Sequence, residues 1–196
     1  MFLKLLSTIS DNYSYFEEFI LEDSRDWLMV VFLPLIIVFL VTAYVGLERQ
    51  NVGKAAGISA HVLVGLAATA IAIIQRLMFI SQTEAGISDP EGQRVIAQVV
   101  TGIGFIGAGV IMKDTHNIIH GITTAATIWF AALLGIVLGS GYILIGSILG
   151  GFVMIFMTLR DLKRGVNPFV PHPNSASQRL IDHKIEPDTD LGEADK

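Results

Sequence analysis

The stretch "QVVTGIGFIGAGVIM", residues 98–112, decides between two different kinds of protein. Three of its glycines, Gly102, Gly104 and Gly107, spell G-x-G-x-x-G, with which a soluble βαβ unit binds a dinucleotide. That pattern also requires a preceding strand and an acidic residue about 20 residues further on. Here the glycines lie inside a run without charged side chains, which is typical of a membrane-spanning helix. We therefore interpret them as residues that let helices pack closely.

The composition of the whole chain supports a membrane protein. Of its 196 residues, 52% are hydrophobic and 16% are charged, whereas a soluble domain carries about 25% charged residues. The net charge is −5, and no basic patch of the kind that binds nucleic acid is present in the sequence. The absence of cysteine excludes disulfides, thiol catalysis and Cys-ligated metals.

Outward from residues 98–112, the chain divides into apolar runs of similar length. Each is close to the roughly 20 residues that an α-helix needs to cross a bilayer. We predict an all-α, polytopic membrane protein, a compact bundle of about five transmembrane helices with glycine-mediated packing. The runs are residues 27–47, 57–80, 95–112, 121–139 and 142–159.

Three regions follow from these runs. Residues 1–26 form an acidic segment, either an interfacial helix or a solvated lead-in to the first span. Their apolar part is too short for a signal peptide, so we expect this segment to be retained. Residues 27–160 form the transmembrane domain. Residues 161–196 lack the apolar content of a core, and we predict a disordered tail.

The glycines predict which helix is central. Gly102 and Gly109 share one side of the 95–112 helix, and Gly104 and Gly107 lie on another. A helix with small residues on two sides can contact neighbours on both, so we expect this helix at the centre of the bundle. The predicted packing glycines are Gly57, Gly65, Gly102, Gly104, Gly107, Gly109 and Gly135.

Basic residues near the helix ends predict the topology. Six lysines and arginines flank the helix ends on one side of the predicted membrane, and four lie on the other. Because the cytoplasmic side carries the excess of basic residues, we expect the N-terminus outside and the C-terminus in the cytoplasm.

Ionisable groups at membrane depth are candidates for function, because an unpaired one is costly there. Glu48 and Arg49 are such candidates, although snorkelling to the interface would also explain them. His61 fits a hydrogen-bonded packing histidine better than a metal ligand, and Arg94 with Gln98 fits a functional and a structural role equally. No helix carries a mid-membrane carboxylate, which counts against a Mg²⁺ path. No catalytic motif is present, so we expect no enzyme, cofactor or metal.

Three separated motifs resemble those of the MgtC/SapB family. They are "GLERQNVGKAAGISAHVLVGL" (46–66), "DPEGQRVIAQVVTGIGFIGAGVI" (89–111) and "HGITTAATIW" (120–129), in the family's order. The resemblance covers about residues 46–140. The functional candidates on family motif positions are Glu48, Arg49, His61, Asp89, Arg94, Gln98, Thr123, Thr124 and Trp129.

The resemblance implies a protein of the bacterial inner membrane. Members of the family are linked to growth in low Mg²⁺, virulence, acid stress and restraint of the ATP synthase. It implies a non-enzymatic modulator of Mg²⁺ and ATP homeostasis or stress survival. Such a modulator contacts membrane lipid and other integral membrane proteins, such as ATP synthase or a transporter, and a homodimer is a further expected contact. The alternative is a small ion or anion transporter or channel, with Arg94 and Gln98 lining the path.

The chain departs from the family pattern at four points. Ser59 stands where the family usually has an arginine two residues before the motif histidine, and His120 replaces a basic residue. The D-P-x-R segment is two residues longer. The tail is too short for the soluble domain that many members carry. The roles of those family groups are expected to be altered or absent here.

Overall fold

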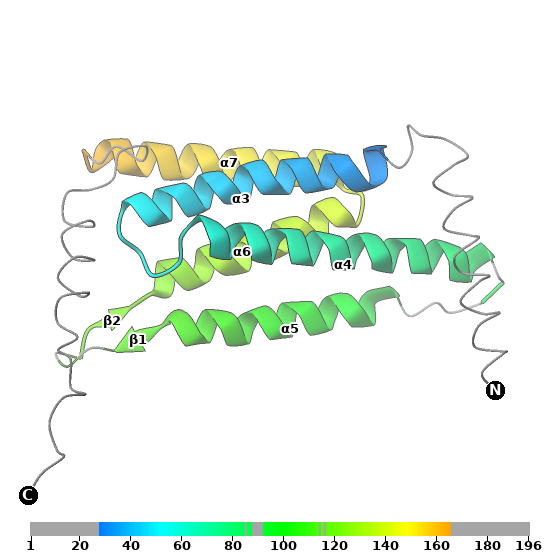
Figure 1. Ribbon diagram of the computed structural model, residues 1–196, viewed down its shortest axis with the longest axis horizontal. Helices are drawn as coiled ribbons and strands as arrows, with labels where there is room; N and C mark the ends of the chain where they lie inside the picture. Colours follow the sequence, from blue (N-terminus) through cyan, green and yellow to red (C-terminus); the bar gives the residue numbers. More distant parts are fainter. Residues whose placement is uncertain (1–27, 85, 88–91, 114, 116, 166–196) are drawn as a thin grey trace, which may run out of the picture.

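The computed structural model describes residues 28–84, 86–87, 92–113, 115 and 117–165. Within them, five long helices lie alongside one another and alternate in direction, as Figure 1 shows. The predicted all-α, polytopic bundle is confirmed. The elements are a π-helical turn (Leu28–Phe32), α3 (Leu33–Asn51), α4 (Ile58–Glu84), α5 (Gly92–Val110), the two-residue strands β1 (Met112–Lys113) and β2 (Ile119–His120), α6 (Ile122–Gly139) and α7 (Ile143–Lys163).

The helices are long enough for a bilayer. Four of them, α3 with its preceding turn, α4, α6 and α7, are sufficiently long and apolar to cross it. The apolar part of α5, Arg94–Val110, is shorter, but the 19 residues of α5 rise about 28 Å. This length approaches the hydrocarbon thickness of about 30 Å. Each predicted run therefore corresponds to one helix, and the chain is a multi-pass membrane protein.

The central helix of the bundle is α6, so the prediction that residues 95–112 take this place is wrong. Helix α6 packs against α3, α4, α5 and α7, whereas α5 packs mainly on α4 and α6. A Cβ atom on Gly135 of α6 would lie 2.5 Å from the carbonyl oxygen of Gly65, and one on Gly139 would lie 2.5 Å from that of Thr69. The backbones of α4 and α6 touch because neither glycine carries a side chain.

The glycines of α5 have a different environment. A Cβ atom on Gly102, Gly104 or Gly109 would meet open space, and one on Gly107 would meet the Cβ of Ala125 at an ordinary 3.7 Å. Helix α5 joins the bundle through larger side chains instead, with Ile103 buried in the core. The prediction that Gly102, Gly104 and Gly109 are packing glycines is therefore wrong for the part of the chain that the structure describes.

The predicted packing glycines of α4 and its lead-in do lie at close contacts. A Cβ atom on Gly65 would lie 2.8 Å from Cγ2 of Thr42 on α3. One on Gly57 would lie 2.7 Å from Oε1 of Gln50. These glycines hold α4 against α3 by the same mechanism that joins α4 to α6.

The two end regions fall largely outside this description. Residues 1–26, predicted as an interfacial helix or a lead-in, and residues 166–196 lie outside the described residues. Helix α7 continues to Lys163, so the bundle extends slightly past the predicted boundary at residue 160.

Because the helices alternate in direction, one end of the bundle collects most of the basic side chains. The α3–α4 connection, the β1–β2 hairpin and the C-terminus of α7 all lie at this end (Figure 1), which we call the basic end. Its basic residues are Arg49, Lys54, Lys113, Arg160, Lys163 and Arg164.

The contrast between α6 and α5 gives a first prediction. Gly135→Ala should lower the free energy of unfolding by about 1–3 kcal/mol, because its methyl group would overlap the α4 backbone. Gly104→Ala, the matched control, should leave stability unchanged or slightly raised, because alanine favours helix and meets no neighbour. Thermal unfolding in detergent measures both. Equal destabilisation of the two variants would contradict the assignment of α6 as the central helix.

Candidate functional site

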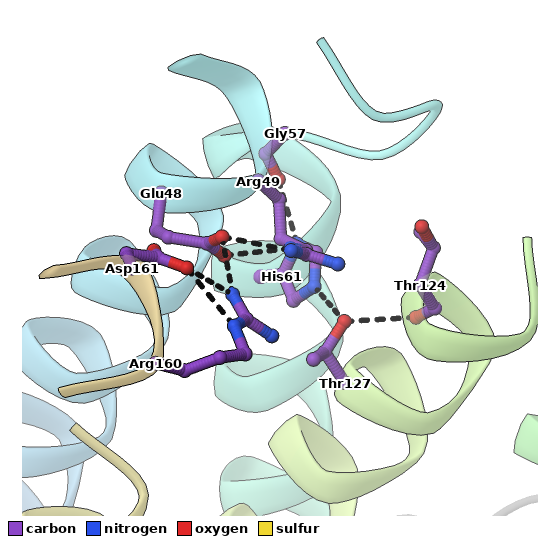
Figure 2. Close-up of polar contacts among 8 residues, drawn as sticks. All are labelled: Glu48, Arg49, Gly57, His61, Thr124, Thr127, Arg160 and Asp161. Atoms are coloured by element: carbon purple, nitrogen blue, oxygen red, sulfur yellow. Dashed lines mark hydrogen bonds and ion pairs between the residues drawn. The ribbon is translucent and has the colours of Figure 1, made fainter. Parts of the chain in front are cut away.

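A cluster of four charged side chains, three of them buried and one partly exposed, lies at the basic end of the bundle. Glu48 and Arg49 come from the last turn of α3, and Arg160 and Asp161 come from the last turn of α7. Figure 2 shows the four side chains converging, with His61 of α4 next to them. Two positive and two negative groups balance, so we call this set the ion-pair cluster.

The carboxylate of Glu48 is the centre of the ion-pair cluster. Arg49 donates from Nε to Oε2 at 2.6 Å and from Nη2 to Oε1 at 2.7 Å. Arg160 donates from Nη2 to the same Oε1 at 2.6 Å, and from Nε to Oδ1 of Asp161 at 2.9 Å. Glu48, Arg49 and Asp161 are at most 2% exposed. One carboxylate therefore neutralises an arginine of its own helix and one from α7.

Because the ion-pair cluster is largely buried, replacing one of its charged side chains should strongly affect the stability of the protein. Removing one partner of a buried ion pair leaves an uncompensated charge, which is far more costly than the pair itself is worth. Among the described residues, Nη1 of Arg49 and Oδ2 of Asp161 are buried without a hydrogen-bond partner, so these two polar atoms of the ion-pair cluster are unsatisfied there. The Glu48–Arg160 contact joins α3 to α7, and the hydroxyl groups of Tyr44 and Thr158 form a second hydrogen bond between the same helices.

His61 links α4 to α6 beside the ion-pair cluster. Its Nδ1 lies 2.8 Å from the carbonyl oxygen of Gly57, and its Nε2 lies 2.9 Å from Oγ1 of Thr127. A carbonyl only accepts, so Nδ1 carries the proton in this geometry. In the neutral ring, Nε2 accepts from the Thr127 hydroxyl. In the charged ring, Nε2 donates, and that hydroxyl turns to the carbonyl oxygen of Thr124, 2.9 Å away.

The structure brings together some of the predicted site residues. Glu48 and Arg49 form the ion-pair cluster, and His61 is connected to Thr124 through Thr127. No group of three or more His, Cys, Asp or Glu side chains that could hold a metal occurs among the described residues.

Other candidates lie away from this site. Arg94 and Gln98 are exposed on α5, and Thr123 and Trp129 are exposed on α6. Asp89 lies outside the described residues.

Sequence reasoning missed the partners from the far end of the chain. Arg160 counts only among the six basic residues of the topology prediction, Asp161 falls in the predicted tail, and Thr127 is not among the predicted candidates. The available signal was the adjacent Arg–Asp pair that ends the last apolar run. With five alternating helices, that pair must lie at the same end as Glu48 and Arg49.

Comparison with known proteins tests the resemblance. The MgtC family matches residues 35–164, a segment that includes the whole ion-pair cluster. The chain belongs to the MgtC family. Among its relatives, YhiD of Escherichia coli K12 is 42% identical over 128 residues, which cover 64% of this chain and 57% of YhiD.

Two further relatives come from other bacteria. MgtC of Brucella abortus is 39% identical over 105 residues, covering 54% of this chain and 40% of that protein. SapB of Bacillus subtilis is 34% identical over 119 residues, covering 57% and 48%. The chain thus spans about half the length of the relatives that it matches. No solved structure matches it significantly.

The geometry of Glu48 gives a second prediction. Glu48→Gln should lower the free energy of unfolding by about 3–5 kcal/mol, because the buried Arg49 then loses its counter-charge and Arg160 keeps only Asp161. Lys163→Gln is the control, since it removes an exposed charge at the same end of the bundle. Chemical unfolding in mixed micelles compares the two. A Glu48→Gln variant as stable as Lys163→Gln would contradict a stabilising role of the ion-pair cluster.

A third prediction concerns the hydrogen bond between α4 and α6. Thr127→Val keeps the side-chain shape but leaves Nε2 of His61 without a partner, at a cost of about 1–3 kcal/mol. Thr127→Ser retains the hydroxyl and should stay close to the original stability. Thermal unfolding distinguishes the two, and equal stability of the valine and serine variants would show that the hydrogen bond contributes nothing.

Proposed function

We propose that this member of the MgtC family is a non-enzymatic regulator of Mg²⁺ homeostasis that acts through contacts with other membrane proteins. The magnesium connection comes from the relatives, since YhiD of Escherichia coli carries the name of a proposed magnesium transporter. Because the chain covers 57% of YhiD, transport itself does not follow from the match.

The main observation behind this proposal is that both oxygens of the Glu48 carboxylate already accept hydrogen bonds from arginines. Mg²⁺ binds hard oxygen ligands and takes carboxylates in preference. Both oxygens of Glu48 already accept hydrogen bonds from Arg49, and Oε1 also accepts one from Arg160. A Mg²⁺ ion reaching Glu48 would have to displace a guanidinium and then lie beside two positive charges. The ion-pair cluster is therefore built to hold helices together and not to conduct a cation.

The transporter alternative uses other residues. Arg94 and Gln98 are both exposed on the outer side of α5, so within one chain they line no interior path. They would line a path only against a second protein or a second copy. This location favours a role in contacts over a role in conduction through a single bundle.

The distribution of charge supports an orientation in the bacterial inner membrane. Positive residues are enriched on the cytoplasmic side of membrane proteins, so we propose that the basic end faces the cytoplasm. The N-terminus then lies outside and the C-terminus inside. ATP synthase or a transporter is the expected kind of partner, reached from within the membrane.

Two measurements on the same protein test the proposal. In a bacterium that lacks its own family member, the chain should restore growth in low Mg²⁺. The purified chain in liposomes loaded with a Mg²⁺-sensitive dye should give no more Mg²⁺ flux than empty liposomes. A flux that rises with the amount of protein would contradict the regulator and favour the transporter. Failure to restore growth with normal membrane levels of the chain would contradict the link to Mg²⁺.

A further inference from the structure

Helix α6 begins at the basic end of the bundle without a side-chain cap. Its N-cap residue is Gly121, whose φ is +90°, and a Cβ atom there would overlap the carbonyl oxygen of Val110. Most helices place serine, threonine, aspartate or asparagine at this position, where the side chain accepts a hydrogen bond from the first turn. Because only glycine fits here, any acceptor for the first turn of α6 comes from another source.

The backbone N–H groups of this first turn lack acceptors in the part of the chain that the structure describes. The first of them to make a backbone hydrogen bond is that of Ala125, which donates to the carbonyl oxygen of Gly121 at 2.8 Å. The N–H groups of Ile122, Thr123 and Thr124 precede it and are the unpaired donors of a helix start. Ile122 and Thr123 are exposed whereas Thr124 is buried, so the turn is open to solvent on one side.

A buried guanidinium faces the same turn from α3. Arg49 is 2% exposed, and its Nη1 is buried without a hydrogen-bond partner among the described residues. In Figure 2 this Nη1 points away from Glu48 and toward Thr124. Nε and Nη2 of the planar group bind Glu48, so the ion pair fixes the direction of Nη1. His61, next to Arg49, contacts Thr127 one turn further along α6.

Both groups of donors favour a negative ligand. A helix N-terminus carries the equivalent of about half a positive charge, and the guanidinium is always protonated. The two connections at this end of the bundle, residues 52–57 and 117–124, contain no aspartate or glutamate. Glu48 lies on the other side of the guanidinium, where it also pairs with Arg160. No carboxylate of the described residues therefore serves Nη1.

We propose that the start of α6 and Arg49 together bind a phosphate-type oxyanion, supplied as free phosphate or as the phosphate of a lipid headgroup. The N–H groups of a helix start and a charged guanidinium are donors that hold phosphate in proteins. The hydroxyl groups of Thr123 and Thr124 belong to the same turn and are further donors. Arg49 keeps both contacts with Glu48 and offers Nη1 to the anion. This site goes beyond the proposed function, because its ligand is neither Mg²⁺ nor a protein.

The melting temperature of the purified full chain measures this binding, because a ligand of the folded state raises that temperature. The chain in lipid-free detergent is titrated with sodium phosphate, and NaCl of equal ionic strength is the reference. A second titration adds phosphatidic acid to the micelles, with phosphatidylcholine as its reference. A saturating rise with sodium phosphate assigns the site to the free ion. A rise with phosphatidic acid alone assigns it to a lipid headgroup.

Two variants locate the site. Arg49→Lys keeps a positive charge beside Glu48 but lacks Nη1, and Thr124→Val keeps the side-chain shape but lacks the hydroxyl. Each should raise the phosphate concentration of the half-maximal shift at least tenfold. Each variant is compared with its own melting temperature in the reference, so lower stability does not imitate weaker binding. Lys163→Gln, which removes an exposed charge at the same end, should respond like the original chain.

Three results would overturn the proposal. The first is a melting temperature that neither source of phosphate raises. The second is a rise that persists unchanged in both Arg49→Lys and Thr124→Val, because the anion then binds elsewhere. The third is a rise that Lys163→Gln also abolishes, because the response then comes from the surface charge of the basic end and not from the start of α6.

Discussion

The carboxylate of Glu48 is the interaction on which the basic end of this bundle depends. It lies almost fully buried between Arg49 of its own helix and Arg160 of α7, more than a hundred residues away in the chain. The buried Arg49 would have no counter-charge without it, and Arg160 would keep only Asp161. The contact therefore fixes the position of the C-terminal end of α7 against α3. It also occupies both carboxylate oxygens of Glu48, which a bound cation would need as ligands. The structure and the proposed regulatory role follow from the same pairing.

The middle of the bundle depends on a second constraint, the close approach of α4 and α6. Gly135 and Gly139 admit the backbone of α4 where any side chain would collide with it. Helix α6 can then contact α3 and α7 as well as α5. Helix α5 is held from one side only, and this leaves its outer side available for contacts beyond the chain.

The sequence predicted the helices well because one physical quantity controls them. Bilayer thickness sets the length of each apolar run, and the five runs correspond to α3–α7 with small shifts at their ends. The central helix was predicted wrongly because glycine content alone does not show what occupies the space beside each glycine. Within the described ranges, that space holds the α4 backbone at Gly135 and no atom within 4 Å at Gly104. For the same reason the sequence identified Glu48 and Arg49 as candidates but not Asp161, whose role depends on the position of α7 in space.

We propose that the ion-pair cluster is a neutralised structural contact and not a Mg²⁺ site. Its most direct test is the melting temperature of the purified protein in MgCl₂ and in NaCl of equal ionic strength, because a ligand that binds the folded state raises that temperature. The melting temperature should be the same in both salts. A melting temperature that rises in MgCl₂ only, and no longer rises in the Glu48→Gln variant, would show that Mg²⁺ binds at the ion-pair cluster and would contradict the proposal.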